Sequence, residues 1–243
     1  WMIKLSQVTE VLQQWMGVQS LWMYLEAVFS SGDIAKDLPQ EAKKFAAIDK
    51  TWLKIMQKAH QSPNVIRFCF ENEMLKSLPS LKDQLEQCQK LLSGYLGQKR
   101  DVFPRFYFCS DPALLEILSQ SSDPHSIQPH LSQIFDSVNS LVFDTKQENK
   151  ILTMVSSEKE SVNLSTPVIA SGNVEDWLQK LEVEMQRTMK DQIRFASEEC
   201  TTLGLKDFID KYPAQVALIG LQFIWTADCE VALKKAKAND KKS

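Results

Sequence analysis

One short segment of this sequence carries side chains of the types that bind metals. Asp123, His125 and His130 lie close together in the chain. However, residues at i and i+5 do not share a helical face, and no cysteine lies near them to complete a ligand set. We therefore interpret the two histidines as capping or surface residues, with a metal site as the alternative.

A second segment has residue types found in nucleophilic catalysis. Glu198 and Glu199 directly precede Cys200 and could be taken for an acid beside a thiol nucleophile. Adjacent carboxylates on a helix point in different directions, and the whole chain has 3 histidines to serve as a base. The pattern therefore does not predict a catalytic cysteine.

Phosphate-binding and hydrolytic motifs are also missing from the sequence. Gly94 and Gly97 precede Lys99 and Arg100, but their spacing is not that of the G-x-x-x-x-G-K-[ST] loop. Dinucleotide glycine fingerprints, H-E-x-x-H and G-x-S-x-G do not occur either. We expect no catalytic residue, no cofactor and no metal in this chain.

Composition narrows the class of protein further. The 243 residues are 44% hydrophobic and 24% charged, which is typical of a folded globular chain. A net charge of −3 offers no basic face for nucleic acid or for an anionic membrane surface. The apolar stretch from Ala214 to Trp225 is shorter than the ~20 residues of a spanning helix. The 5 widely spaced cysteines, without a C-x-x-C pair, favour reduced thiols.

The elements that would position any site are mostly helices. With 7 glycines and 9 prolines the chain has few turn residues, and apolar residues recur at spacings of three and four. The helices that this pattern predicts are centred on 3–25, 39–59, 75–96, 110–118, 125–139, 173–185 and 213–233. A capping residue is expected at Ser110 or Asp111, and Pro39 is expected in a first helical turn.

Strands are predicted in two places. Residues 140–169 alternate apolar and polar side chains in three short runs, and the aromatic run VFPRFYF at 102–108 has high β propensity. The connections are too short for parallel crossovers. The predicted fold class is therefore mostly α, with a small antiparallel sheet inserted between two helical halves.

Two sets of side chains are expected to have ordinary structural roles. The charged residues of the long third helix are interpreted as a solvated face; they are Lys82, Asp83, Glu86, Lys90, Lys99 and Arg100. The six tryptophans lie on apolar stripes and are expected in the core or between helices rather than in a stacking platform for bases; they are Trp1, Trp15, Trp22, Trp52, Trp177 and Trp225.

Five ordered motifs resemble the linker domain of dynein heavy chains. They are LQQWMGVQSLWMYLEAVFSSGDIAKDL (12–38), EAKKFAAIDKTW (41–52), KRDVFPRFYFCSDPALLEIL (99–118), QPHLSQIFDSVNSLVF (128–143) and YPAQVALIGLQFIWT (212–226). The runs VFSSGDIAKDLP and CSDPALLEIL are more similar to axonemal than to cytoplasmic heavy chains, and look like the outer-arm branch. Because Trp1 begins inside a helical pattern with no cap ahead of it, we also expect the chain to be a piece of a longer polypeptide.

The resemblance implies a mechanical role and its partners. A dynein linker is an elongated helical arm that bends and straightens across the AAA+ ring of its own heavy chain, producing the power stroke of a minus-end-directed microtubule motor in cilia or flagella. ATP and Mg²⁺ would bind in the ring, which follows this segment. The microtubule would be reached through the distant stalk, and intermediate and light chains would bind the tail. The expected location is the cytoplasm, in the cytoskeleton of a ciliary or flagellar axoneme, with no nucleic-acid or membrane partner.

Three parts of one linker domain are predicted from the motifs and the periodicity. They are an N-terminal helical part at 1–100, a mixed part with the sheet at 101–170, and a C-terminal helical part at 171–243 that leads to the ring. The alternative is a helical adaptor module that docks another protein's helix in an apolar groove and has no motor role.

Two clusters are expected to carry force, or else to be ordinary core. The first would lock the long third helix to the sheet and comprises Phe103, Arg105, Phe106 and Tyr107. The second would anchor the exit toward the ring and comprises Tyr212, Pro213, Gln215 and Trp225. Arg105, inside an aromatic run, needs a carboxylate or carbonyl partner, so its removal should cost more stability than removal of an exposed arginine.

Overall fold

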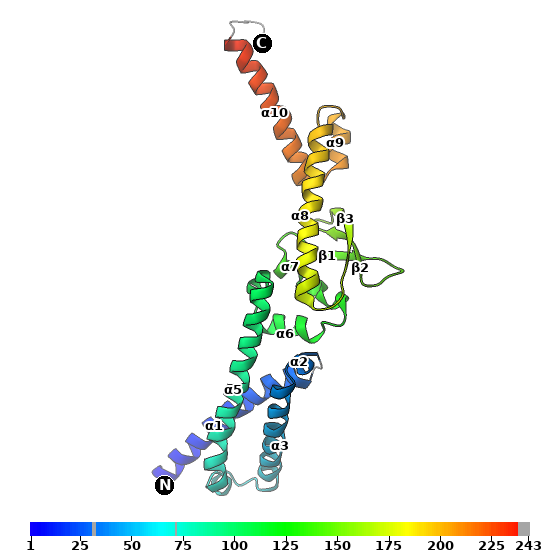
Figure 1. The fold of residues 1–243 in the computed structure, drawn as a ribbon. Coiled ribbons are helices and arrows are strands. Elements are labelled where there is room, and N and C mark those ends of the chain that lie inside the picture. Colours follow the sequence, from blue (N-terminus) through cyan, green and yellow to red (C-terminus); the bar gives the residue numbers. More distant parts are fainter. Residues whose placement is uncertain (31–32, 71, 238–243) are drawn as a thin grey trace. The chain divides into compact units, whose positions relative to one another are not determined.

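The computed structural model describes residues 1–30, 33–70 and 72–237 (Figure 1). These form two compact units, Trp1–Ser126 and Ile127–Ser243, each of which is described by itself. The elements in chain order are α1 (Met2–Ser30), α2 (Asp33–Asp37), α3 (Pro39–Gln61), α4 (Val65–Cys69), α5 (Asn72–Val102), η1 (Pro104–Phe108), α6 (Asp111–Ser119), η2 (Pro124–His130), α7 (Leu131–Ile134), β1 (Ser140–Phe143), β2 (Lys150–Val155), β3 (Ser161–Ile169), α8 (Val174–Glu199), α9 (Leu205–Lys211) and α10 (Ala214–Lys237).

Some of the predicted segments extend beyond the described residues. Ser31 and Gly32 of the first motif and residues 238–243 of the predicted C-terminal part lie outside them. The boundary between the two units, at Ser126, falls inside the mixed part predicted at 101–170. The division into three parts therefore stays a prediction.

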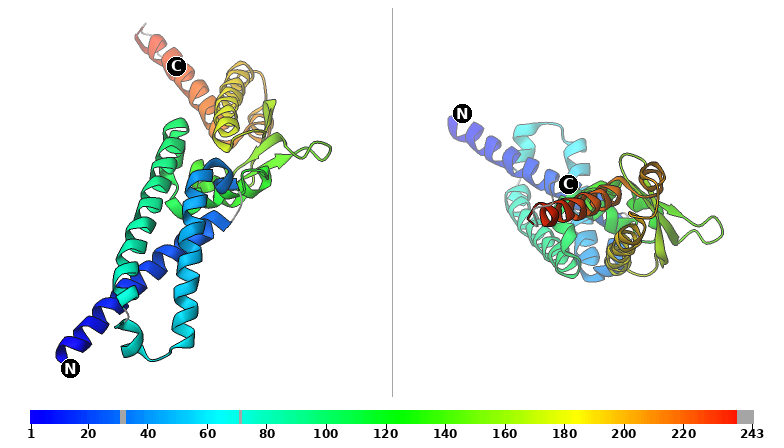
Figure 2. Two further views of the ribbon diagram at one scale, coloured as in Figure 1. Left: turned by 60° about the horizontal axis from the view of Figure 1, so that its bottom comes forward. Right: turned by 90° about the horizontal axis from the view of Figure 1, so that it is seen from above.

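The N-terminal unit is built on the three long helices α1, α3 and α5 (Figure 2). Their shared core contains an aromatic cluster: the Trp15 ring meets Trp52 edge-on at 5.3 Å and Phe68 at 5.2 Å between centroids. Trp22 donates its indole N–H to the Asp49 carboxylate at 2.9 Å. Edge-to-face pairs and a satisfied indole are favourable arrangements for partly buried aromatics.

Local sequence signals define several helix ends, as predicted. Pro39 occupies the first turn of α3, where its missing N–H leaves no helical hydrogen bond unmade. Ser110 is the N-cap of α6, and its hydroxyl accepts a hydrogen bond from the Ala113 N–H. Asn64, which was not predicted as a cap, caps α4 in the same way: its side chain accepts a hydrogen bond from Arg67 N–H.

The aromatic run at 102–108 is not a strand, and this prediction was wrong. Residues Pro104–Phe108 form the 3₁₀ helix η1, and the described sheet has only three strands. Phe106 N–H donates to the Phe103 carbonyl, and Cys109 N–H donates to the Phe106 carbonyl. Phe103, Phe106 and Cys109 are all buried, at a spacing of three that matches one turn of a 3₁₀ helix. A strand would send Phe103 and Phe106 to opposite faces.

The helix predicted at 125–139 is shorter and less regular than expected. The 3₁₀ helix η2 is followed directly by α7, which ends at Ile134. Pro129 lies inside η2 and has no N–H for a helical hydrogen bond, which accounts for the irregular backbone. The expected apolar face is nevertheless buried, through Ile127, Leu131 and Ile134.

The second unit contains the predicted antiparallel sheet, in the order β1-β2-β3. Side chains cover its edges. At β1, the Gln128 amide donates to the Leu141 carbonyl at 2.8 Å and accepts from the Leu141 N–H at 3.1 Å. An edge strand whose backbone is paired in this way is protected from pairing with another chain.

Helix α8 covers β3 where the register of the β2–β3 pair shifts. Ser165 N–H donates to the Thr188 hydroxyl at 2.9 Å, and Thr166 N–H donates to the Glu184 carboxylate at 2.6 Å. Thr188 and Glu184 are both buried. The polar side chains of this amphipathic helix therefore satisfy backbone groups that β2 leaves unpaired.

The C-terminal helices pack closely at one glycine. Gly220 in α10 lies against the Phe208 ring of α9, and a Cβ atom at this position would fall well inside van der Waals contact with that ring. Phe208 is fully buried, in a core formed by α8, α9 and α10. Helix α9 itself was not among the predicted helices.

Helix α10 is longer and more exposed than the sequence suggested. By length and composition alone it is long and apolar enough to cross a membrane, and most of it is not buried in this structure. Of the six tryptophans, Trp52 and Trp177 are buried, whereas Trp1 and Trp225 are exposed. The core prediction is therefore wrong for Trp1, which is 83% exposed, and for Trp225, which is 69% exposed at the surface of α10.

Candidate functional site

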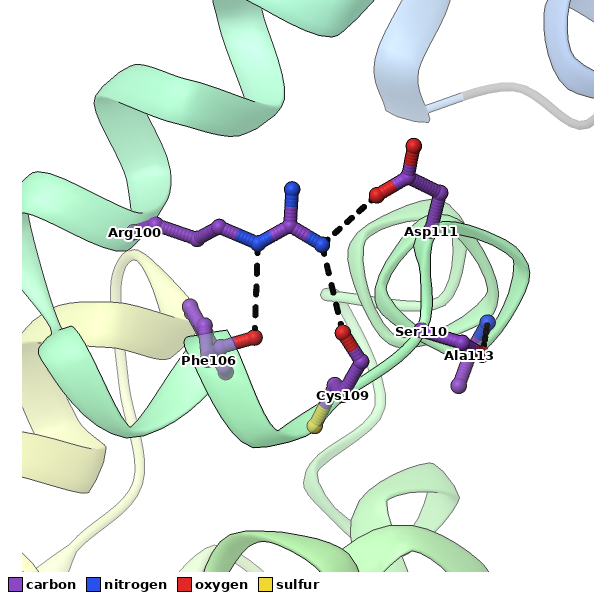
Figure 3. Close-up of polar contacts among 6 residues, drawn as sticks. All are labelled: Arg100, Phe106, Cys109, Ser110, Asp111 and Ala113. Atoms are coloured by element: carbon purple, nitrogen blue, oxygen red, sulfur yellow. Dashed lines mark hydrogen bonds and ion pairs between the residues drawn. The ribbon is translucent and has the colours of Figure 1, made fainter.

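The turn between α5 and α6 is held by one arginine (Figure 3). Arg100, in the last turn of α5, donates from Nε to the Phe106 carbonyl at 3.4 Å. Its Nη2 donates to the Cys109 carbonyl at 3.2 Å and to the Asp111 carboxylate at 2.6 Å. Arg100 thus binds the middle of η1, the residue that follows η1, and the first residue of α6. We call Arg100, η1 and Asp111 the α5–α6 clasp.

The α5–α6 clasp is partly buried and rests on packed aromatic rings. The Arg100 side chain is 16% exposed, and the planar guanidinium reaches its three acceptors in one orientation. Beneath it the Phe103 and Phe106 rings meet edge-on at 4.9 Å, both buried against α5. Burial also raises the pKa of the Cys109 thiol, which Arg100 partly offsets. The direction of α6 relative to α5 is therefore fixed by both packing and charge.

The first predicted cluster is only partly assembled here. Phe103 and Phe106 are buried as expected, whereas Tyr107 is 64% exposed and donates to Asp101 from its hydroxyl. Arg105 is half-buried. These side chains pack on α5; the expected lock to the sheet stays a prediction.

Arg100 itself was missed, because its charge was assigned to a solvated face. The signal that could have found it is its place in the last helical turn, where a cation meets free backbone carbonyls. In this structure the carbonyls that Arg100 binds belong to the segment after α5, at Phe106 and Cys109.

The short helix α2 is held at both of its ends. Asp33 accepts hydrogen bonds from Lys36 at 2.7 Å and from the Ser122 hydroxyl at 2.7 Å. These bonds lower the pKa of Asp33 to about 2. At the other end, Asp37 accepts a hydrogen bond of 2.6 Å from the Tyr95 hydroxyl of α5. Asp33 and Asp37 thereby join α2 to two other parts of the N-terminal unit.

A second clasp closes the turn from α8 to α10. The Glu199 carboxylate, at the end of α8, accepts from the Tyr212 hydroxyl at 2.7 Å and from the Lys211 ammonium. Burial, followed by the hydrogen bond to Glu199, raises the pKa of Tyr212 to about 12, and the two donors lower the pKa of Glu199. We call Glu199, Lys211 and Tyr212 the α8–α10 clasp.

The second predicted cluster is divided by the structure. Tyr212 is buried in the core and takes part in the α8–α10 clasp, and Pro213 follows it at the joint. Gln215 is exposed on the first turn of α10, and Trp225 is 69% exposed. The tryptophan and the tyrosine are therefore not in one packed cluster.

The histidines and the cysteine that were considered as metal ligands or as a nucleophile lie in packed or hydrogen-bonded positions. His130 is buried, and the backbone N–H of His125, in the first turn of η2, donates to the Asp123 carboxylate. Cys200 is buried at the end of α8, and neighbouring Glu199 is engaged in the clasp. Within residues 1–30, 33–70 and 72–237, no three His, Cys, Asp or Glu side chains are grouped to hold a metal.

Two open grooves occur on the described surface. One, of about 400 Å³, lies between α9 and α10 and is mainly apolar; its lining is Cys200, Leu203, Leu205, Phe208, Leu221, Ile224, Trp225 and Asp228. The other, of about 580 Å³, lies between α3 and α5; its lining is Leu38, Glu41, Gln87, Lys90, Leu91, Gly94, Tyr95 and Gln98. Neither groove brings together a nucleophile, a base and an anion-binding group.

Taken together, the described residues define a mostly helical protein with a small antiparallel sheet, in which polar clasps hold the joints between helices. Comparison with known proteins identifies its family. The family model described as "Dynein heavy chain, N-terminal region 2" matches residues 1–196. The chain belongs to the dynein heavy chain family.

Individual relatives are axonemal. The chain is 50% identical to rat dynein axonemal heavy chain 5 over 244 aligned residues, covering 99% of this chain and 7% of that protein. It is 49% identical to mouse dynein axonemal heavy chain 8, covering 99% of this chain and 5% of the relative. It is 49% identical to the flagellar outer-arm dynein gamma chain of Chlamydomonas reinhardtii, covering 98% and 5%. The chain therefore spans a small part of the length of these relatives.

Proposed function

We propose that this chain is the linker of an axonemal dynein heavy chain, a lever that bends and straightens across the AAA+ ring of the same polypeptide. The observation that carries the proposal is the match over 99% of the chain to an axonemal heavy chain at 50% identity. Axonemal relatives favour a place in the axoneme of cilia or flagella. An outer-arm position is favoured by the 49% identity to the Chlamydomonas gamma chain.

The two clasps support a mechanical role. A lever loses little of a stroke when its helices meet at joints that do not yield, and close-packed interiors have low compressibility. In the α5–α6 clasp one partly buried guanidinium binds three acceptors, and in the α8–α10 clasp one carboxylate binds two donors. Each clasp holds the turn between two helices within one unit.

Chemistry and track binding are proposed to lie elsewhere in the heavy chain. ATP and Mg²⁺ would be bound by the ring, and this chain would contribute no catalytic residue. Microtubules would be reached through the stalk, while intermediate and light chains would bind the tail. A stroke directed toward the microtubule minus end would then be the combined output of ring, stalk and linker.

The test is a heavy chain that carries Arg100→Ala, compared with one that carries Lys82→Ala. Lys82 lies on the same helix in an exposed pair with Glu86. We expect Arg100→Ala to lower microtubule gliding velocity several-fold at an ATPase rate that stays within about twofold, because a yielding joint wastes displacement but not hydrolysis. Unchanged gliding per ATP in Arg100→Ala and in the Tyr212→Phe variant of the other clasp would overturn the lever role.

An adaptor function is the second candidate, and one observation favours it. Helix α10 exposes large apolar side chains beside the apolar groove shared with α9; they are Leu218, Phe223, Trp225, Val231 and Leu233. An adaptor would use this surface to dock a helix of another protein. Normal gliding by a heavy chain with Trp225→Ala and Leu218→Ala, together with loss of a bound partner, would favour the adaptor over the lever.

A further inference from the structure

The start of α10 receives a carboxylate from a distant part of the chain. The Ala214 N–H, at the first residue of the helix, donates to Glu160 Oε1 at 3.0 Å across 54 residues of sequence. The first turn of a helix has backbone N–H groups without helical partners, and it carries partial positive charge. The first turn of α10 has no acidic residue of its own. Glu160 thus gives the first turn of α10 the hydrogen-bond acceptor and negative charge that other helices receive from a neighbouring capping residue.

Hydrogen bonds within the hairpin turn between β2 and β3 fix the backbone position of Glu160. Ser156 N–H donates to the Glu160 carbonyl at 2.9 Å, and Glu160 N–H donates back to the Ser156 hydroxyl at 3.1 Å. Lys159 adopts a positive φ of 67° and donates its N–H to the Ser156 carbonyl. The backbone of Glu160 is therefore closed into the turn, and its side chain extends from a rigid base.

The residue before the helix is held from the other side. Tyr212 donates to Glu199 of α8, Pro213 follows with its φ fixed by the ring, and Ala214 donates to Glu160. The joint at Tyr212–Ala214 therefore lies between two carboxylates, one from α8 and one from the hairpin. Two attachment points from different elements restrict the direction of a helix more than one does.

We propose that Glu160 is a positioning residue that sets the direction in which α10 leaves the sheet. Its side chain couples the β2–β3 hairpin to the helix, so that a load on α10 reaches the sheet as well as α8. The hydrogen bonds of Glu160 and Glu199 to Ala214 and Tyr212 support the positioning role. Its mechanical consequence rests on the proposed lever function.

The experiment compares Glu160→Ala, Glu160→Gln and Glu158→Ala in the 243-residue chain. Glu158 is the matched control, because it is a carboxylate of the same turn and is exposed. Hydrogen exchange of the Ala214 amide is read by NMR, and residual dipolar couplings compare the orientation of α10 with that of the sheet. We expect Glu160→Ala to speed exchange at Ala214 on the order of fivefold, as loss of a helix cap does. The couplings of α10 should then no longer fit the alignment of the sheet.

The conservative variant separates positioning from general stability. The amide oxygen that Glu160→Gln introduces can still accept from Ala214 N–H, so this variant should restore most of the protection and the alignment. A merely structural role for the hairpin would predict no such rescue. Wild-type exchange at Ala214 and unchanged couplings in Glu160→Ala would overturn the inference, as would equal effects of Glu158→Ala.

The alignment of α10 tests the positioning role of Glu160, whereas microtubule gliding tests the lever role. If α10 keeps its alignment in Glu160→Ala, the positioning role is wrong, while the lever is still judged by gliding of the Arg100→Ala heavy chain. If the alignment changes as expected and gliding is normal for all clasp variants, Glu160 positions α10 and the lever role is wrong.

Discussion

The guanidinium of Arg100 and the carboxylate of Asp111 meet at 2.6 Å across the turn that joins α5 to α6. The pair connects the last turn of one helix to the first residue of the next. Because Arg100 also binds the carbonyls of Phe106 and Cys109, the 3₁₀ turn between the helices cannot open without breaking charge-assisted hydrogen bonds.

Removing this arginine should destabilise the N-terminal unit. Arg100→Ala removes the charged donor that the Phe106 and Cys109 carbonyls and the Asp111 carboxylate share, and we expect the free energy of unfolding to fall by about 2 kcal/mol. Arg100→Lys keeps the charge without the planar fork, so its stability should lie between those of the wild type and Arg100→Ala. Urea unfolding followed by circular dichroism measures these changes.

Variants of three other basic residues complete this test. Lys82→Ala, in an exposed pair on the same helix, should change stability by less than about 0.5 kcal/mol. Arg105→Ala should cost more than Arg194→Ala, because Arg105 is half-buried and Arg194 is exposed. An Arg105→Ala variant that melts like the wild type contradicts the locking role predicted for that residue.

Acid should weaken the attachment of α2. Hydrogen bonds from Lys36 and Ser122 lower the pKa of Asp33 from 3.8 to about 2. A carboxyl whose folded pKa is depressed contributes stability above its unfolded pKa, and this contribution is lost as the pH falls from about 4 to 2. Titration of unfolding free energy against pH should show this loss in the wild type and less of it in Asp33→Asn. Equal acid sensitivity of the two proteins would mean that Asp33 is not bonded as described.

Alkali should open the α8–α10 clasp. The pKa of Tyr212 is raised from 10.0 to about 12, so its stabilising effect is complete below pH 10 and is lost as the pH rises from 10 to 12. Tyr212→Phe keeps the ring and removes the hydroxyl, so its stability should fall less steeply in this range. Tyr24 and three buried thiols also have raised pKa values, but they are present in both proteins. Subtracting one pH profile from the other therefore cancels their contributions. Parallel profiles would contradict the hydrogen bond to Glu199.

Replacing glycine by alanine should lower the stability of one unit and raise that of the other. In Gly220→Ala the new methyl group meets the buried Phe208 ring, and overpacking of this kind costs about 1–3 kcal/mol. At Gly94 and Gly97 in α5 nothing lies within 4 Å of a Cβ atom, so alanine should stabilise the helix by about 0.5–1 kcal/mol. Thermal unfolding of the three variants decides this. A Gly220→Ala variant as stable as Gly94→Ala would show that α9 and α10 are not in close contact.

Local patterns in the sequence determined most of the helices and the three strands of the sheet. Periodicity is a local property, and so are the proline that starts α3 at Pro39 and the serine cap of α6 at Ser110. Antiparallel pairing followed from the short connections between strands. These features need only neighbouring residues, and the structure confirms them.

The tertiary structure decided which partner each polar side chain takes. β propensity favoured a strand at 102–108, but burial of Phe103, Phe106 and Cys109 on one side of a turn favoured a 3₁₀ helix. The charge of Arg100 was read as solvated because its acceptors appear only once η1 has folded beneath it. Likewise, the bonds from Ser122 to Asp33 and from Ala214 to Glu160 join residues far apart in sequence. Such pairs form when packing brings two elements together, so local sequence patterns do not predict them.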